Sequence, residues 1–151
     1  MPATSWLVKQ LAKDFPQFSF KASHRFLWSP SDKTIFYNAA EPHANELLLH
    51  ELAHGILKHN QYRRDIELIT IEQLTWEYVA KLSPRYQITI NKDFIHTNLD
   101  SYRDWLHIRS TCPSCTSSGL QTTKTTYQCL ACGQTWRVNN AKTCALRRYK
   151  L

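Results

Sequence analysis

The stretch ELLLHELAHGIL, residues 46–57, decides the fold of this chain. Its apolar residues fall on more than one side of a helix, which is typical of a helix buried over most of its surface. Pro42, shortly before this stretch, is acceptable in the first turn of such a helix. The pattern predicts a central, largely buried helix over residues 42–59.

Three polar residues interrupt the apolar pattern and form the motif His50-Glu51-Leu-Ala-His54. Residues four apart share one helical face, so both histidines can direct a ring nitrogen at one metal ion. Two buried histidines and a carboxylate would be costly to desolvate without such a partner. Three protein ligands leave room for a water molecule, whose pKa zinc lowers to about 7. The motif predicts a catalytic zinc held by His50 and His54, with Glu51 as general base toward the zinc-bound water.

The third ligand has to come from outside the motif. Glu72 lies on an apolar stripe of the following helix, whereas Glu77 precedes Lys81 by four residues, the favourable order for an ion pair on the solvent side. His59, five residues beyond the motif, would point roughly 140° away from it on a continuous helix. Glu72 is the predicted third ligand and Glu77 the alternative. The remaining candidates are Glu67, His59, His96 and His107.

An α+β domain is predicted around this helix. Alternating polar and apolar residues predict strands at 18–22, 25–29 and 34–38, with a Ser-Pro-Ser-Asp turn at 29–32, and therefore a small antiparallel sheet. Helices are predicted at 5–13, 66–82 and 99–108. Residues 1–110 are thus expected to form a zincin-like metallopeptidase domain, with the sheet packed on the HExxH helix and on the helices that follow it.

Four of the five cysteines form two CxxC pairs, Cys112 with Cys115 and Cys129 with Cys132. Two such pairs close a tetrahedral shell of four thiolates around one zinc ion, whereas a redox CxxC needs only one pair at the start of a helix. A segment this short has almost no core, so the metal supplies its folding energy. A four-cysteine zinc ribbon over residues 111–140 with a structural zinc is predicted. Tyr127 and Trp136 are expected to pack across it, and Cys144 to be a free thiol.

Charge is distributed unevenly along the 151 residues, whose net charge is +7. Residues 105–151 hold seven Lys and Arg and no Asp or Glu, and the last part, 141–151, reads as a basic tail. Such a segment suggests nucleic acid or an acidic protein surface as a partner. The alternatives are a basic tail that only keeps the protein soluble and a ribbon that supports the protease domain. The chain has no apolar run long enough to span a membrane, and paired CxxC without a signal peptide indicates a reducing compartment. We expect a cytoplasmic protein without a membrane partner.

The HExxH stretch and the following helix carry a family resemblance, through Glu72, Thr75, Trp76 and Val79. Over about residues 19–82 the chain resembles the ImmA/IrrE family of small zinc metallopeptidases. The resemblance implies that His50, His54 and Glu72 hold the zinc. It further implies that Glu51 is the base and that the strand over 34–38 is the edge strand that pairs with substrate.

The chain departs from that family in two respects. Gln73 and Leu74 follow the glutamate where the family usually has Ala and then Asn, and a C-terminal ribbon is not a standard part of it. A second resemblance is to the SprT-like group, because Tyr127-Gln-Cys129-Leu-Ala-Cys132 fits the ribbon of that group. The third histidine of SprT-like proteins has no matching residue on the second helix.

The main hypothesis is a zinc endopeptidase that cleaves a protein substrate, such as a nucleic-acid-associated regulator. One alternative is a SprT-like, DNA-associated protease. The other is a zinc-ribbon module that binds nucleic acid or protein and carries an inactive protease-like domain. The complete motif favours catalysis, because a structural zinc would not need Glu51 and would tend to fill all four coordination positions.

Overall fold

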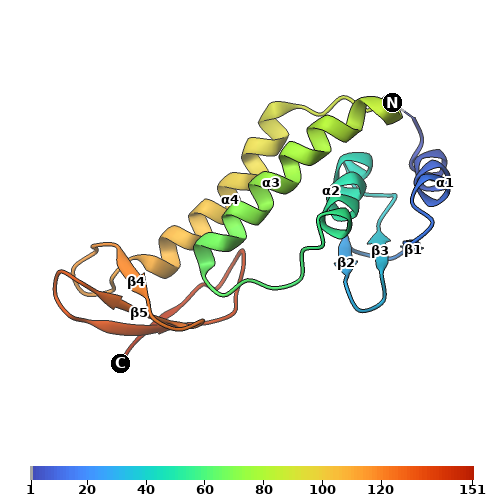
Figure 1. Ribbon diagram of the computed structural model, residues 1–151. Helices are drawn as coiled ribbons and strands as arrows, with labels where there is room; N and C mark the ends of the chain where they lie inside the picture. The colour runs from blue at the N-terminus through green and yellow to red at the C-terminus, as the bar shows by residue number, and fades with distance from the viewer. Residues whose placement is uncertain (1) are drawn as a thin grey trace. The chain divides into compact units, whose positions relative to one another are not determined.

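The computed structural model describes residues 2–151, which divide into two compact units (Figure 1). The first unit runs to Gln61 and includes Gln73–Lys92, and the second comprises Tyr62–Glu72 and Asp93–Leu151. This division differs from the predicted boundary at residue 110, because the start of one helix and most of another group with the C-terminal strands. None of the helices within residues 2–151 is long and apolar enough to cross a membrane.

The first unit confirms the α+β class. It contains α1 (Thr4–Asp14), β1 (Ser19–Ala22), β2 (Leu27–Ser29), β3 (Thr34–Tyr37), α2 (Ala44–Ile56), the second part of α3 (Asp65–Leu82) and the short 3-10 helix η1 (Ser83–Tyr86). The core around α2 consists of side chains with no exposed surface, among them Leu48, Leu49, Leu52 and Ala53 of α2 with Leu7 and Leu11 of α1. The predicted central helix is therefore present and buried.

The three-stranded sheet corrects two expectations. Its order is β1-β3-β2, so the strand predicted as the edge, residues 34–38, is central and β2 is an edge strand. The sheet is also mixed, since β2 pairs antiparallel with β3 while β1 pairs parallel with it. Strand β3 is central because β2 and β3 pair as a hairpin and β1 pairs with the other side of β3.

The central helix is shorter than predicted at both ends. Its N-cap, His43, adopts the left-handed conformation with φ of 60°, so the helix begins at Ala44. After Ile56 the chain turns at Lys58, which has φ of 58°, and the His59 N–H donates to the carbonyl of His54 at 2.9 Å. This turn brings residue 59 back toward the helix instead of continuing it.

The second unit combines the start of α3, most of α4 (Lys92–Ser110) and a four-stranded antiparallel sheet. The sheet has the order β4 (Gly119–Gln121), β5 (Thr126–Cys129), β6 (Thr135–Val138) and β7 (Arg148–Lys150). Strand β7 comes from the segment read as a basic tail, so that expectation is corrected: the segment pairs with β6. The predicted packing of Tyr127 on Trp136 is confirmed, with ring centroids 5.6 Å apart and an interplanar angle of 10°.

A buried ionic network joins the start of α3 to the end of α4 and to the ribbon. The Asp65 carboxylate accepts hydrogen bonds from Arg109 Nε at 2.7 Å and from the Tyr127 hydroxyl at 2.5 Å. Its backbone N–H donates to Gln121 Oε1 at 2.8 Å. Burial and the bond to Asp65 raise the pKa of Tyr127. The ribbon of the second unit is therefore anchored to both helices through side chains that have little contact with water.

Candidate metal centres

The two motif histidines of α2 face each other through the same ring atom. Nε2 of His50 lies 3.0 Å from Nε2 of His54, and their rings meet edge to face at 4.6 Å between centroids. Two nitrogens bound to one zinc ion at about 2.0–2.1 Å lie at a comparable separation. The His50 ring packs on Trp76 of α3, with centroids 4.3 Å apart, which restricts its rotation. Together with Glu51 these histidines form a group whose ligand atoms lie within 4.8 Å of one another.

The Glu51 carboxylate is held by the edge strand. Its Oε2 atom accepts a hydrogen bond from the backbone N–H of Trp28, at 2.9 Å. Trp28 lies in the middle of β2, whose neighbouring residues pair with β3, so this N–H projects from the open side of the strand. The contact fixes where the carboxylate lies relative to the helix, and it uses the outward N–H of the edge strand. Sequence reasoning did not identify Trp28, because a single N–H contact leaves no residue pattern.

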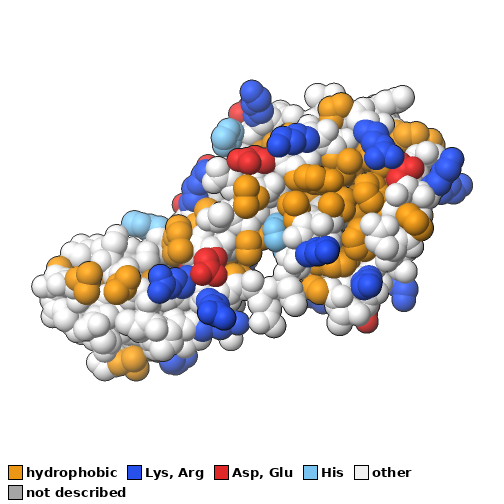
Figure 2. All heavy atoms as spheres, viewed as in Figure 1, with side chains coloured by type: hydrophobic (Ala, Val, Ile, Leu, Met, Phe, Trp, Pro, Cys, Tyr) orange, Lys and Arg blue, Asp and Glu red, His pale blue; other side chains and the backbone are white. Residues whose placement is uncertain are grey.

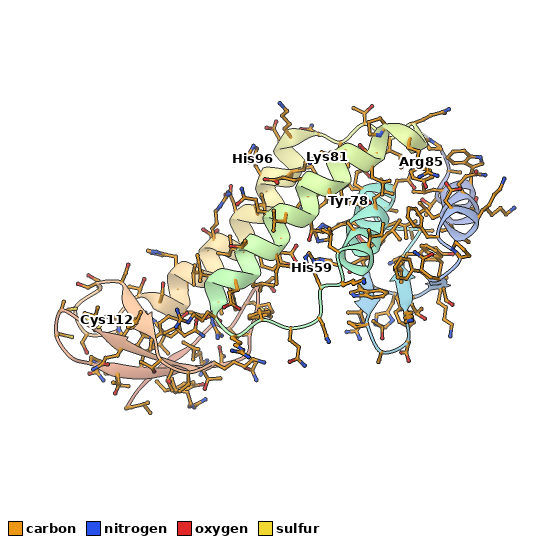
Figure 3. The ribbon with its side chains drawn as sticks, in the orientation of Figure 1. His59, Tyr78, Lys81, Arg85, His96 and Cys112 are labelled. Atoms are coloured by element: carbon orange, nitrogen blue, oxygen red, sulfur yellow. The ribbon has the colours of Figure 1, made fainter. Side chains whose placement is uncertain are left out.

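On the other side of its ring, His54 contacts His59, one of the remaining candidates for the third ligand, and Thr75, for which no role in the site was predicted. Its Nδ1 lies 2.9 Å from Nδ1 of His59, which Figure 3 shows in the segment that follows α2. The hydroxyl of Thr75 lies 3.4 Å from the His54 nitrogen and 3.3 Å from that of His59. Since His50 approaches Nε2 and His59 approaches Nδ1, the two neighbours occupy opposite sides of the ring. His59 therefore does not share the metal position of His50, and it is placed to orient His54 instead.

The candidates for the third ligand differ in exposure. Glu72 is buried, with 4% of its surface exposed, while Glu77 is exposed and its carboxylate accepts a bond from Gln73. The burial of Glu72 agrees with its place on an apolar stripe, and the residue lies one helical turn before Thr75 and Trp76 on α3. Its role as a metal ligand stays a prediction, because the close group contains only His50, Glu51 and His54.

The other candidates do not have the burial expected of a ligand in a Leu-rich site. Glu67 is exposed and its carboxylate accepts the backbone N–H of Arg63 at 2.9 Å, which lowers the pKa of Glu67. His96 and His107 are exposed on α4.

The four predicted cysteines of the ribbon come together as one cluster. Cys112 Sγ lies 3.7 Å from Cys132 Sγ, and Cys115 Sγ lies 3.5 Å from Cys129 Sγ. Thiolates bound tetrahedrally at a Zn–S distance of about 2.3 Å lie about 3.8 Å apart, so these separations fit a zinc ion. All four are far from the S–S distance of a disulfide, and Cys144 lies outside the cluster as predicted. Figure 3 labels Cys112, where the ribbon begins.

The two CxxC turns repeat the same backbone geometry. In each, the residue after the second cysteine adopts positive φ, 66° at Thr116 and 79° at Gly133. The N–H of that residue donates to the carbonyl of the first cysteine at 3.0 Å in both turns. Glycine suits this conformation, whereas a β-branched threonine is strained in it. The closed cluster therefore holds Thr116 in a conformation that an isolated chain would avoid.

Without a metal, the thiols of Cys115 and Cys132 have pKa values shifted in opposite directions. Hydrogen bonds from Ser117 lower the pKa of Cys115 to about 6. At Cys132 the Gln134 N–H acts in the same direction, but burial and the neighbouring thiols outweigh it and raise the pKa to about 11. Adjacent thiolates repel each other, and a divalent cation removes that repulsion. The donor set thus fits a cation that binds four thiolates.

The basic residues of the ribbon do not all lie on its surface. Arg109, one of the seven Lys and Arg within residues 105–151, is buried and paired with Asp65, so it does not belong to a basic surface as expected. The other six are exposed: Lys124, Arg137, Lys142, Arg147, Arg148 and Lys150.

Both donor sets suit zinc by their chemistry, imidazole nitrogens beside a carboxylate in the first unit and four thiols in the second. Comparison of the chain with protein-family models, with curated proteins and with solved structures gives no match.

Proposed function

We propose that the protein is a zinc-dependent metalloendopeptidase that hydrolyses peptide bonds of a protein substrate. The observation that carries the proposal is the group formed by His50, Glu51 and His54, with both Nε2 atoms turned toward each other and the carboxylate held beside them. A site that only stabilised the fold would have no use for a carboxylate placed next to two ligands. The ImmA/IrrE resemblance agrees with this proposal and is not required for it.

His50 and His54 would hold the zinc ion, and we propose Glu72 as the third protein ligand. Zinc bound there would act as a Lewis acid that acidifies water and polarises a peptide carbonyl. Support for Glu72 comes from its burial and from its position one turn before Thr75 and Trp76, which contact the two motif histidines. Glu72→Ala should weaken zinc binding at this site, whereas Glu77→Ala, an exposed glutamate on the same helix, should not.

Glu51 performs the proton transfers of the proposed reaction. It accepts a proton from the water that adds to the peptide carbonyl carbon, and it delivers that proton to the nitrogen as the C–N bond breaks. The Trp28 N–H holds the carboxylate in place through a 2.9 Å hydrogen bond. An extended substrate segment would lie along the edge strand β2, beside the carboxylate that the Trp28 N–H holds.

The test compares the parent protein with Glu51→Gln, which keeps size and a hydrogen-bond acceptor but removes the base. Zinc content and melting temperature should match those of the parent, while hydrolysis of unfolded protein substrates should fall by about 10² or more. Equal hydrolysis by both proteins would indicate a contaminating protease and refute the proposal.

Nucleic-acid binding by the ribbon is the second candidate function, alone or together with the peptidase. Six exposed Lys and Arg within residues 111–151 support it, and Arg137 stacks on the exposed Tyr149 with 4.4 Å from guanidinium carbon to ring centroid. Binding of a labelled single-stranded oligonucleotide should weaken steeply with salt, as counterion release requires. Salt-independent binding, or none, would leave the ribbon without this role.

A further inference from the structure

A cavity of about 420 Å³ opens beside β2 in the first unit. In the view of Figure 2, hydrophobic side chains gather on the visible face of the first unit, with Lys and Arg around them. Trp28 packs on Phe18 edge to face, with centroids 5.3 Å apart. A side chain at Gly55 would meet both rings at 3.2–3.3 Å, so the glycine lets them lie against α2. The apolar part of the lining consists of Phe15, Phe18, Trp28, Pro30, Gly55 and Ile56.

Trp28 connects this cavity to the candidate catalytic site. Its backbone N–H donates to Glu51, its ring lines the cavity, and its indole N–H donates to the His59 carbonyl at 3.1 Å. A peptide side chain held in the cavity would therefore contact the same residue that positions the Glu51 carboxylate.

Two lysines line the cavity in an unusual backbone conformation. Lys33 has φ of 49° and Lys58 has φ of 58°, a region that favours glycine and asparagine. Both side chains are exposed, and within residues 2–151 neither ammonium group forms an ion pair. No Asp or Glu lines the cavity.

We propose that this cavity is a specificity pocket that binds a large apolar side chain, aromatic by preference, of an extended peptide. Lys33 and Lys58 bind an acidic residue next to that side chain. The substrate class is thus a protein segment in which an aromatic residue stands beside Asp or Glu. The proposal rests on the peptidase function for its biological meaning, but the pocket can be tested without hydrolysis.

The experiment measures binding of labelled eight-residue peptides to the zinc-loaded Glu51→Gln protein by fluorescence polarisation. The reference peptide carries one Phe flanked by Glu in a Gly/Ser background, and two controls replace Phe by Ala or Glu by Gln. Loss of the aromatic ring should weaken binding about tenfold or more. Loss of the acidic groups should weaken it about twofold to fivefold for each lysine that they contact, and added salt should reduce that difference.

Lys33→Gly and Lys58→Gly separate the role of the side chain from its effect on folding. Each variant relieves positive φ, so the melting temperature should stay the same or rise, while the preference for Glu over Gln peptides falls. Gln87→Gly is the matched control, because Gln87 has φ of 58° in the same unit and lies outside the cavity. It should leave the peptide preference unchanged.

Unchanged Glu preference in both lysine variants, or equal binding of the Phe and Ala peptides, would overturn the pocket assignment. Failure of all the peptides to bind would do the same. Hydrolysis by the parent without any such preference would leave the peptidase standing and refute the pocket. Selective binding without hydrolysis by the parent would refute the peptidase and retain the pocket as a peptide-binding site.

Discussion

Replacing His59 tests whether this residue orients the metal ligand His54. For Nε2 of His54 to bind zinc, Nδ1 has to carry the proton, and that N–H then donates to Nδ1 of His59, 2.9 Å away. His59→Phe keeps a ring of similar size but removes the acceptor. The backbone should stay in place, because the His59 N–H and carbonyl make their own bonds to His54 and Trp28.

The expected magnitude follows from the geometry of this contact. Loss of a partner that orients a metal-binding histidine typically lowers metal affinity about 10-fold to 100-fold, or about 1.4–2.7 kcal/mol. The lower part of that range is expected, because the Thr75 hydroxyl still lies 3.4 Å from the same nitrogen. His59→Asn should restore much of the affinity, since its amide oxygen can accept the same hydrogen bond.

Zinc affinity is measured by competition with a chelator, and the four-cysteine site serves as an internal reference within the same molecule. His59→Phe should weaken the histidine site and leave the cysteine site unchanged. An unchanged histidine site in His59→Phe, or equal weakening in His59→Phe and His59→Asn, would refute the positioning role.

Three further predictions concern folding. Gly133→Ala should destabilise the zinc-loaded ribbon by about 1 kcal/mol. Because open space surrounds the position, this cost comes from the positive φ and not from a clash. Thr116→Gly should not destabilise the ribbon, and zinc-dependent melting of the two variants checks both expectations. Asp65→Asn should cost about 3–5 kcal/mol in urea unfolding, because it leaves the buried Arg109 without its charged partner, and a cost below about 1 kcal/mol would contradict the network. Burial and a hydrogen bond to Asp14 raise the pKa of Tyr86 from 10.0 to about 12. The stability that the neutral hydroxyl contributes should therefore be complete below pH 10 and lost as the pH rises through 12. Urea unfolding at several pH values should show this dependence in the parent protein and not in Tyr86→Phe.

Strong local patterns made much of the fold predictable. The HExxH stretch fixed one face of a Leu-rich helix, and the prediction of α3 over residues 66–82 agrees with Asp65–Leu82 to within one residue. The start of α4 was missed by seven residues, because residues 92–98 are exposed or half-buried and lack an apolar period. Burial of one face is what sequence periodicity reports, so a helix segment without it gives little signal.

Long-range pairing was harder to predict than local structure. The alternating pattern identified the strands of the first unit, but strand order depends on which edge of β3 accepts β1, and the alternation is the same for either edge. The alternation therefore does not show that β2, and not the strand over 34–38, is the edge strand beside Glu51. In the C-terminal segment, the many basic residues indicate a tail and give no sign that β7 pairs with β6.

The site was predictable where ligands follow a spacing rule and unpredictable where they depend on the turn of a loop. The cysteine pairs and the motif histidines converge as their spacing requires. The predicted direction of His59 assumes a continuous helix. The positive φ of Lys58 ends the helix instead, and the His59 ring then lies beside Nδ1 of His54. Glycine in a sequence signals that positive φ is possible there, whereas a lysine that adopts positive φ gives no such signal.

The metal content of the purified protein tests the central claim most directly. Elemental analysis should find two zinc ions per chain, because the histidine site and the cysteine site draw on separate residues. His54→Ala should remove one zinc ion and Cys129→Ser the other, each leaving the second in place. A single zinc ion in the parent protein that either variant abolishes, or a zinc content that His54→Ala leaves unchanged, would contradict the catalytic zinc site.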